Sequence, residues 1–121
     1  MNANKELVID FYNSDALYNS KTLDTFLHPE VVLEWNSSKG FLKKDRKGLL
    51  QSADELKIGY EAIVVQIHQI ISEENIVSVH YTLFGTTIEN PNHINRLALF
   101  FVNWEIQDGK LFKGYQMSQL P

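Results

Sequence analysis

The sequence contains no cysteine, which excludes disulfide bonds, cysteine-ligated metals and thiol nucleophiles. Acidic residues outnumber basic ones, and the formal net charge of -4 disfavours nucleic acid as a partner, because phosphate binding relies on lysine and arginine. No apolar run approaches the roughly 20 residues that cross a bilayer, so we expect no membrane partner. The first residues lack the apolar stretch of a secretion signal, which predicts a cytoplasmic protein.

The residues that are present are typical of one globular domain. Of the 121 residues, 44% are hydrophobic and 21% are charged, a balance that supports a buried core and argues against disorder. No repeat, linker or low-complexity tract divides the chain. We therefore expect a single domain over residues 1–121.

Helical periodicity characterises the N-terminal part of the sequence. Apolar residues of the first dozen positions recur on one face of a helix, and Asn2 or Asn4 is a suitable N-cap. A second, short helix is predicted over residues 21–27 with Ser20 as its cap. Pro29 ends this helix, because the residue before a proline avoids the helical conformation.

The next segment predicts a strand, a turn and a third helix. A Val-rich strand is predicted over residues 30–35 and a turn over residues 36–40. Asp45 is the predicted N-cap of the third helix, and Gly59 is the predicted left-handed residue at its C-terminus. We interpret the basic run of residues 43–47 as the solvated start of this helix.

After residue 59 the apolar pattern changes from the helical period to the strand period. Four strands are predicted, over residues 60–71, 76–87, 94–106 and 111–118. Asp108-Gly109, between two alternating runs, is a strong hairpin signal. Long strands twist and coil, so helices on one face enclose a concave interior. The predicted fold class is therefore α+β, with N-terminal helices packed on a strongly curved, mainly antiparallel sheet.

The strand over residues 94–106 is apolar on both faces. One face carries Ala98, Phe100, Val102, Trp104 and Ile106, and the other includes Leu99 and Phe101. A sheet that is apolar on both sides needs a second cover. We therefore predict a homodimer that forms through the convex face of the sheet.

Three stretches of the sequence, in this order and spacing, resemble segments of the nuclear transport factor 2-like superfamily, in its SnoaL-like and ketosteroid isomerase-like branch. Residues 27–32, LHPEVV, resemble the hPDvv segment that enters the first strand. Residues 80–86, HYTLFGT, resemble the rwtltGt strand end, and residues 104–111, WEIQDGKL, resemble the frfrdGKI hairpin. The resemblance runs from about residue 5 to residue 118 and implies a single SnoaL-like domain with a cone-shaped fold and a pocket.

The proton-transfer residues that the resemblance implies for ketosteroid isomerases are not matched here. Their helix-one tyrosine falls near Phe11, or on Tyr12 if the alignment shifts by one. Their general-base aspartate falls on Trp35, and their protonated aspartate falls near Phe100 or Phe101. A general base must exchange a proton near the working pH, and tryptophan and phenylalanine cannot.

The residues implied by SnoaL-type polyketide cyclases are not matched either. Their catalytic aspartate falls on Gln116, their supporting histidine on Val102, and a first-strand asparagine on Leu33. A glutamine amide donates and accepts hydrogen bonds but does not titrate. The catalytic residues, if there are any, are therefore unknown from the sequence.

We predict instead an apolar, aromatic pocket for a small hydrophobic ligand, with Gln116 as its clearest polar group. The predicted pocket residues are Phe11, Tyr12, Leu33, Trp35, Tyr60, Tyr81, Phe100, Val102, Trp104 and Gln116. No cofactor is expected. His68 and His80 share a face of the sheet, but no fixed carboxylate accompanies them, so no metal site is expected. We expect His28 and His93 at the surface.

Two alternatives stay open at this point. The first is a divergent isomerase, polyketide-cyclase-like or lyase enzyme, which would use groups drawn from Tyr12, Tyr81, Glu34, His80 and Gln116. The second is a non-catalytic dimeric domain that binds other proteins. The fold alone does not separate these functions, because one fold hosts many activities.

Overall fold

The computed structural model describes residues 2–121, and in that range three α-helices and a short 3₁₀ turn accompany six strands. The helical elements are α1 (Ala3–Asn13), η1 (Ala16–Tyr18), α2 (Ser20–Phe26) and α3 (Arg46–Gly59). The strands are β1 (Leu27–Ser37), β2 (Gly40–Asp45), β3 (Tyr60–Glu73), β4 (Ile76–Thr87), β5 (Asn95–Gln107) and β6 (Lys110–Gln119). No helix within residues 2–121 is long and apolar enough to cross a membrane.

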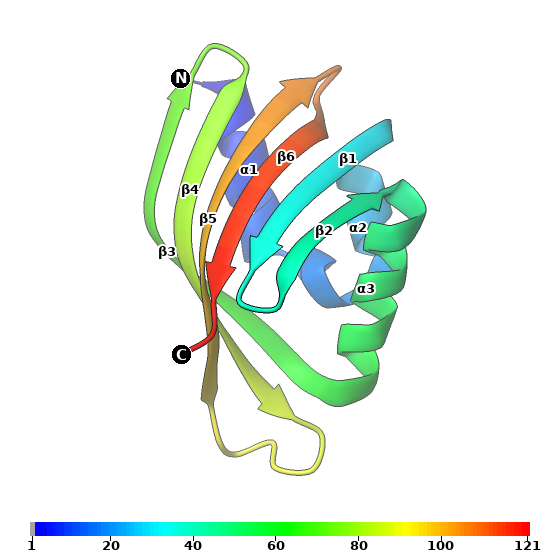
Figure 1. Cartoon of the computed structure of the whole chain (residues 1–121), viewed down its shortest axis with the longest axis vertical. Coiled ribbons are helices and arrows are strands. Elements are labelled where there is room, and N and C mark those ends of the chain that lie inside the picture. The colour runs from blue at the N-terminus through cyan, green and yellow to red at the C-terminus, as the bar shows by residue number, and fades with distance from the viewer. Residues whose placement is uncertain (1) are drawn as a thin grey trace.

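The strands form one curled sheet in the order β2-β1-β6-β5-β4-β3, and the helices lie on its concave side (Figure 1). Neighbouring strands are antiparallel, except that β1 and β6 are parallel. The parallel pair follows from the chain order, because the last strand inserts between the first strand and the meander. The prediction of an α+β fold, with helices on a strongly curved and mainly antiparallel sheet, is confirmed.

The hairpin between β5 and β6 has the geometry that its sequence predicts. Asp108 and Gly109 both have left-handed backbone angles, with φ of 55° and 70°. These angles are those of a tight two-residue turn whose twist matches the twist of the flanking strands. The hairpin sets the register of β6, which places Gln116 beside Val102 of β5.

The prediction for residues 36–45 was incomplete, because it contained a turn but no second strand. The turn is confined to residues 38–39, and β2 follows it and pairs with β1, where Leu42 lies opposite Trp35. Phe41 and Leu42 are both exposed on this edge strand. The strand therefore has no alternation of buried and exposed residues, and backbone pairing with β1 alone defines it.

Side-chain caps start the helices, as expected, but one cap was assigned to the wrong residue. The Asn2 side chain accepts hydrogen bonds from the first turn of α1, and Asp45 accepts one from the amide of Gly48 in α3. In α2 the cap is Asn19 rather than Ser20, because Asn19 has the extended backbone that a capping residue needs. Its side chain accepts the Lys21 amide at 3.1 Å.

The left-handed ending predicted for α3 at Gly59 is wrong. Gly59 is the last helical residue, and its φ is not in the left-handed range. Tyr60 follows it with φ of −126° and ψ of 137°, which is already the conformation of β3. The chain therefore passes directly from helix to strand, which leaves no position for a left-handed residue.

The core lies between the inner face of the sheet and the helices. The alternating inward residues of β5 are all buried, as predicted: Ala98, Phe100, Val102, Trp104 and Ile106. On β6 a register shift beside Ile106 places Leu111 in the core and leaves Phe112 only partly buried. A bulge of this kind reverses the faces on one side of it, and an alternating pattern cannot locate it.

Candidate functional site

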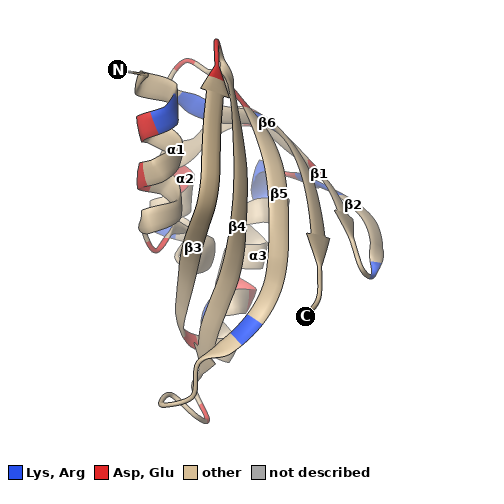
Figure 2. Ribbon diagram, turned by 90° about the vertical axis from the view of Figure 1, so that its left-hand side faces the viewer, with Lys and Arg blue, Asp and Glu red and all other residues tan. Residues whose placement is uncertain are grey.

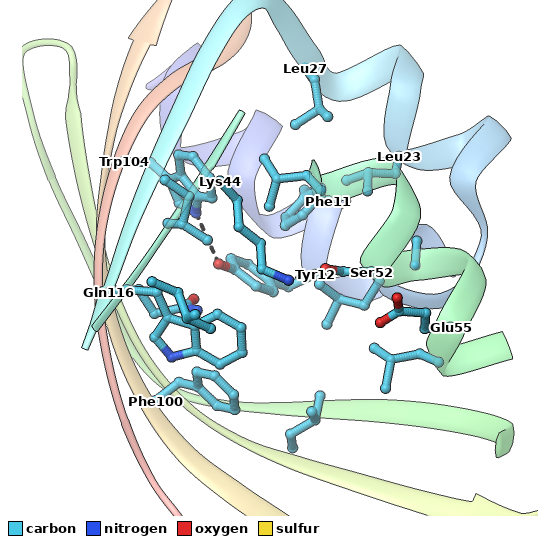
Figure 3. Close-up of a pocket in the computed structure, with 18 of the residues that line it drawn as sticks. Phe11, Tyr12, Leu23, Leu27, Lys44, Ser52, Glu55, Phe100, Trp104 and Gln116 are labelled. Carbon is cyan, nitrogen blue, oxygen red and sulfur yellow. Dashed lines mark hydrogen bonds between the residues drawn. The ribbon is translucent and has the colours of Figure 1, made fainter. Parts of the chain in front are cut away.

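A cavity of about 550 Å³ lies between the inner face of the sheet and the helices (Figure 3). The predicted pocket residues at its wall are Phe11, Tyr12, Leu33, Trp35, Tyr81, Phe100, Trp104 and Gln116. Leucines from η1, α2, the start of β1 and α3 complete most of the apolar wall: Leu17, Leu23, Leu27, Leu49 and Leu56. The volume is in the usual range for sites that hold small molecules.

Two predicted pocket residues, Tyr60 and Val102, lie outside the cavity wall. Val102 faces inward and is buried, but its short side chain lies between the larger rings of Phe100 and Trp104, which reach the cavity instead. Tyr60 is the first residue of β3 and lies close to Gly85, away from the cavity. Strand alternation identified the correct face for Val102 but does not say which side chains reach the space above it.

Aromatic rings form the floor of the cavity. Tyr81 and Phe100 stack with their centroids 4.8 Å apart and their planes 4° apart. Trp35 lies 6.1 Å from Phe100 at a tilted angle, and Phe11 meets Tyr12 edge to face at 4.7 Å. Such pairs are stabilising beyond the area they bury. The floor is therefore an apolar surface of packed aromatic rings.

One hydroxyl group is held at this floor by a buried hydrogen bond. The indole N–H of Trp104 donates to the Tyr12 hydroxyl oxygen at 2.9 Å (Figure 3). Burial raises the pKa of Tyr12 well above its ordinary value, although hydrogen bonds with Trp104 and Tyr81 act in the opposite direction. Burial raises the pKa of Tyr81 as well, and the nearby Tyr12 adds to the effect. Both phenols therefore stay protonated at neutral pH and act as donors rather than bases.

The position of Trp104 depends on a glycine, Gly114, in the neighbouring strand β6. A Cβ atom at Gly114 would lie 2.7 Å from Cζ3 of Trp104 and 2.6 Å from Cδ1 of Leu33. Both are far below normal contact distances, so only glycine allows the indole this close to β6. The second indole, that of Trp35, donates to the Ser118 hydroxyl at 2.7 Å. Both tryptophans of the chain are thus held at the cavity by hydrogen bonds.

Four polar residues at the mouth of the cavity were not predicted: Lys39, Lys44, Ser52 and Glu55. Lys44 belongs to the basic run that we interpreted as a solvated helix start. It lies on β2 instead, and its ammonium group donates a hydrogen bond to the Ser52 hydroxyl of α3. The error has the same cause as the missing strand, because the sequence contains no periodic signal for β2.

Two of the groups considered for catalysis face away from the cavity. Glu34 alternates with Leu33 and Trp35, which line the cavity, so its side chain points to the other side of the sheet. His80 stacks on Phe101 of the outer face, with centroids 4.1 Å apart. Among the five groups considered from the sequence, Tyr12, Tyr81 and Gln116 line the cavity.

The histidines do not form a metal site in the part of the chain that the structure describes. His68 bonds Thr82 at 2.6 Å and lies 4.8 Å from the ring of His80, but no group of three or more His, Cys, Asp or Glu residues gathers within residues 2–121.

The surface position predicted for His28 is wrong. The His28 ring is buried against Phe112, and its Nδ1 accepts a hydrogen bond from the Glu30 amide at 3.0 Å.

Comparisons with known proteins match the structure but not the sequence. No model of a protein family and no curated protein matches this sequence. Among solved structures, the chain is similar to IdmH, a proposed polyketide cyclase from Streptomyces antibioticus, with a TM-score of 0.71 and 16% identity over 95% of this chain and 91% of that one. It is also similar to a protein with a ketosteroid isomerase-like fold from Catenulispora acidiphila, solved with trimethylamine. That match has a TM-score of 0.72 and 12% identity, over 92% of this chain and 83% of the other.

A third similar structure is an NTF2-like protein of unknown function from Burkholderia pseudomallei, with a TM-score of 0.69 and 14% identity. The match covers 96% of this chain and 90% of that one. At these identities the similarity concerns the arrangement of the backbone and not the activity. The order of helices and strands, the curled sheet and these matches agree, and the chain therefore has the nuclear transport factor 2-like, ketosteroid isomerase-like fold.

Proposed function

We propose that this protein binds a small hydrophobic molecule in the cavity between the sheet and the helices. The observation that carries the proposal is the cavity itself, about 550 Å³ with a wall made mainly of aromatic and leucine side chains. A ligand that buries about 300 Å² of apolar surface would gain on the order of 7 kcal/mol before the costs of association. Apolar burial of this size supports binding without any reaction.

The two tryptophans make the proposal directly testable. Trp35 and Trp104 are the only tryptophans of the sequence, and both line the cavity. Titration with a fused-ring ketone, such as a steroid or an anthraquinone, should therefore change the intrinsic fluorescence and reach saturation.

A blocked cavity supplies the control. Ala53 of α3 lines the cavity and is buried, so Ala53→Phe should fill the space and abolish the change. Asp54→Phe, at the next and exposed residue, should leave the change intact. The proposal fails if every ligand of this class leaves the fluorescence of the folded wild-type protein unchanged.

A second candidate function is catalysis on such a molecule, by an isomerase, a polyketide-cyclase-like enzyme or a lyase. The observation in its favour is Tyr12, whose hydroxyl oxygen already accepts from Trp104 and whose own proton remains available to a ligand. A protonated phenol can stabilise an enolate oxygen as it forms, and loss of such a donor commonly lowers the rate by about 10²–10³.

This second function predicts a measurable reaction. A β,γ-unsaturated ketone should convert to its conjugated isomer, followed by ultraviolet absorbance, and Tyr12→Phe should slow the reaction by at least about tenfold. Tyr115→Phe, on the outer face, supplies the control because its hydroxyl is exposed far from the cavity wall. No conversion above the uncatalysed rate would leave ligand binding as the function.

We also propose that two copies of the chain pair through the outer face of the sheet. This face exposes large apolar side chains on three neighbouring strands, among them Leu99, Phe101, Tyr115 and Met117. The strands β3, β4 and β5 carry charged residues only near their ends (Figure 2). An uncharged apolar patch is complementary to a copy of itself across a two-fold axis, which supports a homodimer.

Sedimentation equilibrium tests the dimer. The wild-type chain should sediment as a dimer at micromolar concentration, and Phe101→Glu should make it a monomer. Phe41→Glu is the matched control, because Phe41 is also 55% exposed but lies on β2 at the other edge of the sheet. A wild-type monomer at 100-fold higher concentration would refute the dimer, and with it the non-catalytic dimeric alternative.

A further inference from the structure

Lys44 brings a positive charge to the wall of an otherwise apolar cavity. Its side chain extends from β2 across the opening toward α3, and its ammonium group lies between the aromatic floor and Ser52 (Figure 3). The ammonium nitrogen is 5.8 Å from the ring centroid of Trp35, on the face of the indole. The residue is half-buried, so the charge lies at the boundary between the apolar interior and solvent.

The hydrogen bonds around Lys44 do not use all the N–H donors of its ammonium group. Ser52 donates its own proton to the carbonyl of Gly48 at 3.0 Å, so its oxygen accepts from Lys44. An ammonium group has three N–H donors, and the Trp35 ring attracts the cation without removing one of them. Ser52 is the one acceptor of the Lys44 ammonium among residues 2–121, so N–H donors of this group are left for a ligand.

No carboxylate of the described residues neutralises this charge. The ion pairs within residues 2–121 are His28–Asp108 and Arg46–Asp24, and neither involves Lys44. Glu55 lines the cavity mouth but is exposed, and its carboxylate accepts from Gln51 on its own helix at 3.4 Å. Lys39, on the turn before β2, is a second cation at the mouth. The mouth therefore carries two positive charges and one negative charge, in a protein whose net charge is -4.

We infer that the molecule bound in this cavity is an amphipathic acid, whose single carboxylate pairs with Lys44 while its apolar body lies along the floor. The inference rests on the proposed function and specifies its ligand. The stacked pair of Tyr81 and Phe100 offers the body a flat surface, and the Lys44 ammonium offers the head group a charge-assisted hydrogen bond. A neutral molecule of the same shape would offer the ammonium group no charge-assisted hydrogen bond.

A matched pair of ligands separates this inference from simple apolar binding. Isothermal titration calorimetry with 2-naphthoic acid and 2-naphthylmethanol compares one apolar body with and without the charge. The wild-type protein should bind the acid at least about tenfold more tightly, and added salt should reduce this preference because the mouth is partly exposed.

Substitutions at Lys44 and its neighbours complete the test. Lys44→Met should remove the preference for the acid and leave the affinity for the alcohol unchanged. Lys43→Met, at the adjacent exposed residue, should preserve the preference. Equal affinities of the wild-type protein for both ligands, or a preference that persists in folded Lys44→Met, would overturn the inference and leave hydrophobic binding in place. If neither ligand binds and fused-ring ketones also fail, the proposed function itself fails.

Discussion

The two faces of the sheet are built from similar residues and differ in what covers them. On β5, Phe100 is buried at the cavity floor and Phe101, its neighbour in the chain, is 55% exposed on the outer side. The inner face is covered by helices of the same chain (Figure 1). The cavity lies between these helices and the sheet. On the outer face, large apolar side chains such as Phe101, Tyr115 and Met117 are exposed.

The polar groups of the two faces show the same contrast. On the inner face the indole of Trp104 donates to Tyr12, and the indole of Trp35 donates to Ser118. On the outer face the Nε2 atom of His80 is buried and has no hydrogen-bond partner among the described residues. Both indole N–H groups of the inner face therefore have acceptors, whereas the outer face contains one buried nitrogen without a partner among the described residues.

The largest loss of stability should come from truncating Phe100, the inward-facing one of the two adjacent phenylalanines. Phe100→Ala should lower the free energy of unfolding by about 3 kcal/mol, the lower end for a buried phenylalanine, since the cavity beside it already reduces its packing. Phe101→Ala should cost less than about 0.5 kcal/mol in the monomer. Urea denaturation at low protein concentration measures both, and equal losses would show that the faces do not differ in packing.

A glycine pair tests how tightly the inner face is packed around Trp104. Gly114→Ala should destabilise the protein by about 1–3 kcal/mol, because the new Cβ would collide with Trp104 and Leu33. Gly59→Ala should be neutral or stabilising by up to about 1 kcal/mol, since nothing lies within 4 Å of its Cβ position at the end of α3. Thermal unfolding and tryptophan fluorescence report both changes. An unchanged stability of Gly114→Ala would contradict the close approach of Trp104 and Leu33 to Gly114.

Alkaline pH should lower the stability of the protein through the two buried phenols of the inner face, Tyr12 and Tyr81. Burial raises the pKa of Tyr12 and of Tyr81 above the ordinary value of 10.0, so the folded state retains phenolic protons that the unfolded chain loses above pH 10. Stability from this source is complete below pH 10 and declines as the pH rises beyond it.

The corresponding measurement is the urea midpoint at pH 8 and at pH 11. Tyr12→Phe should reduce the decline between the two values, because it removes one of the two phenols that burial keeps protonated. Tyr115→Phe, on the exposed outer face, should show the wild-type decline. An identical decline in all three proteins would mean that the buried phenols do not contribute to the alkaline instability.

The smallest effect concerns the two histidines of the outer face. His80→Leu removes the unpaired Nε2 atom and should stabilise the protein by up to about 1 kcal/mol, since an apolar group has no hydrogen bond to lose. His68→Leu breaks the bond to buried Thr82 and should destabilise it by about 1 kcal/mol. Chemical denaturation of both variants gives opposite signs, and the same sign in both would refute the assignment.

Much of the candidate site follows from alternation along the strands. The inward residues of β5 and the position of Gln116 on β6 were predictable, because apolar side chains at period two must share a face. Tyr12 was predictable from the apolar stripe of the first helix. Lys44 was not, because its role depends on β2, an exposed edge strand defined only by its pairing with β1.

The sequence by itself determined the fold class, the order of the elements other than η1 and β2, and the inner face of the sheet. These are properties of local periodicity, turn chemistry and hydrophobic patterning, which each residue and its near neighbours specify. Only the tertiary structure decided that Trp104 and Tyr12, 92 positions apart, share a hydrogen bond, and that Lys44 reaches the cavity. Those contacts depend on the curl of the sheet, on its bulges and on the gap under the helices, and all three arise when distant segments pack together.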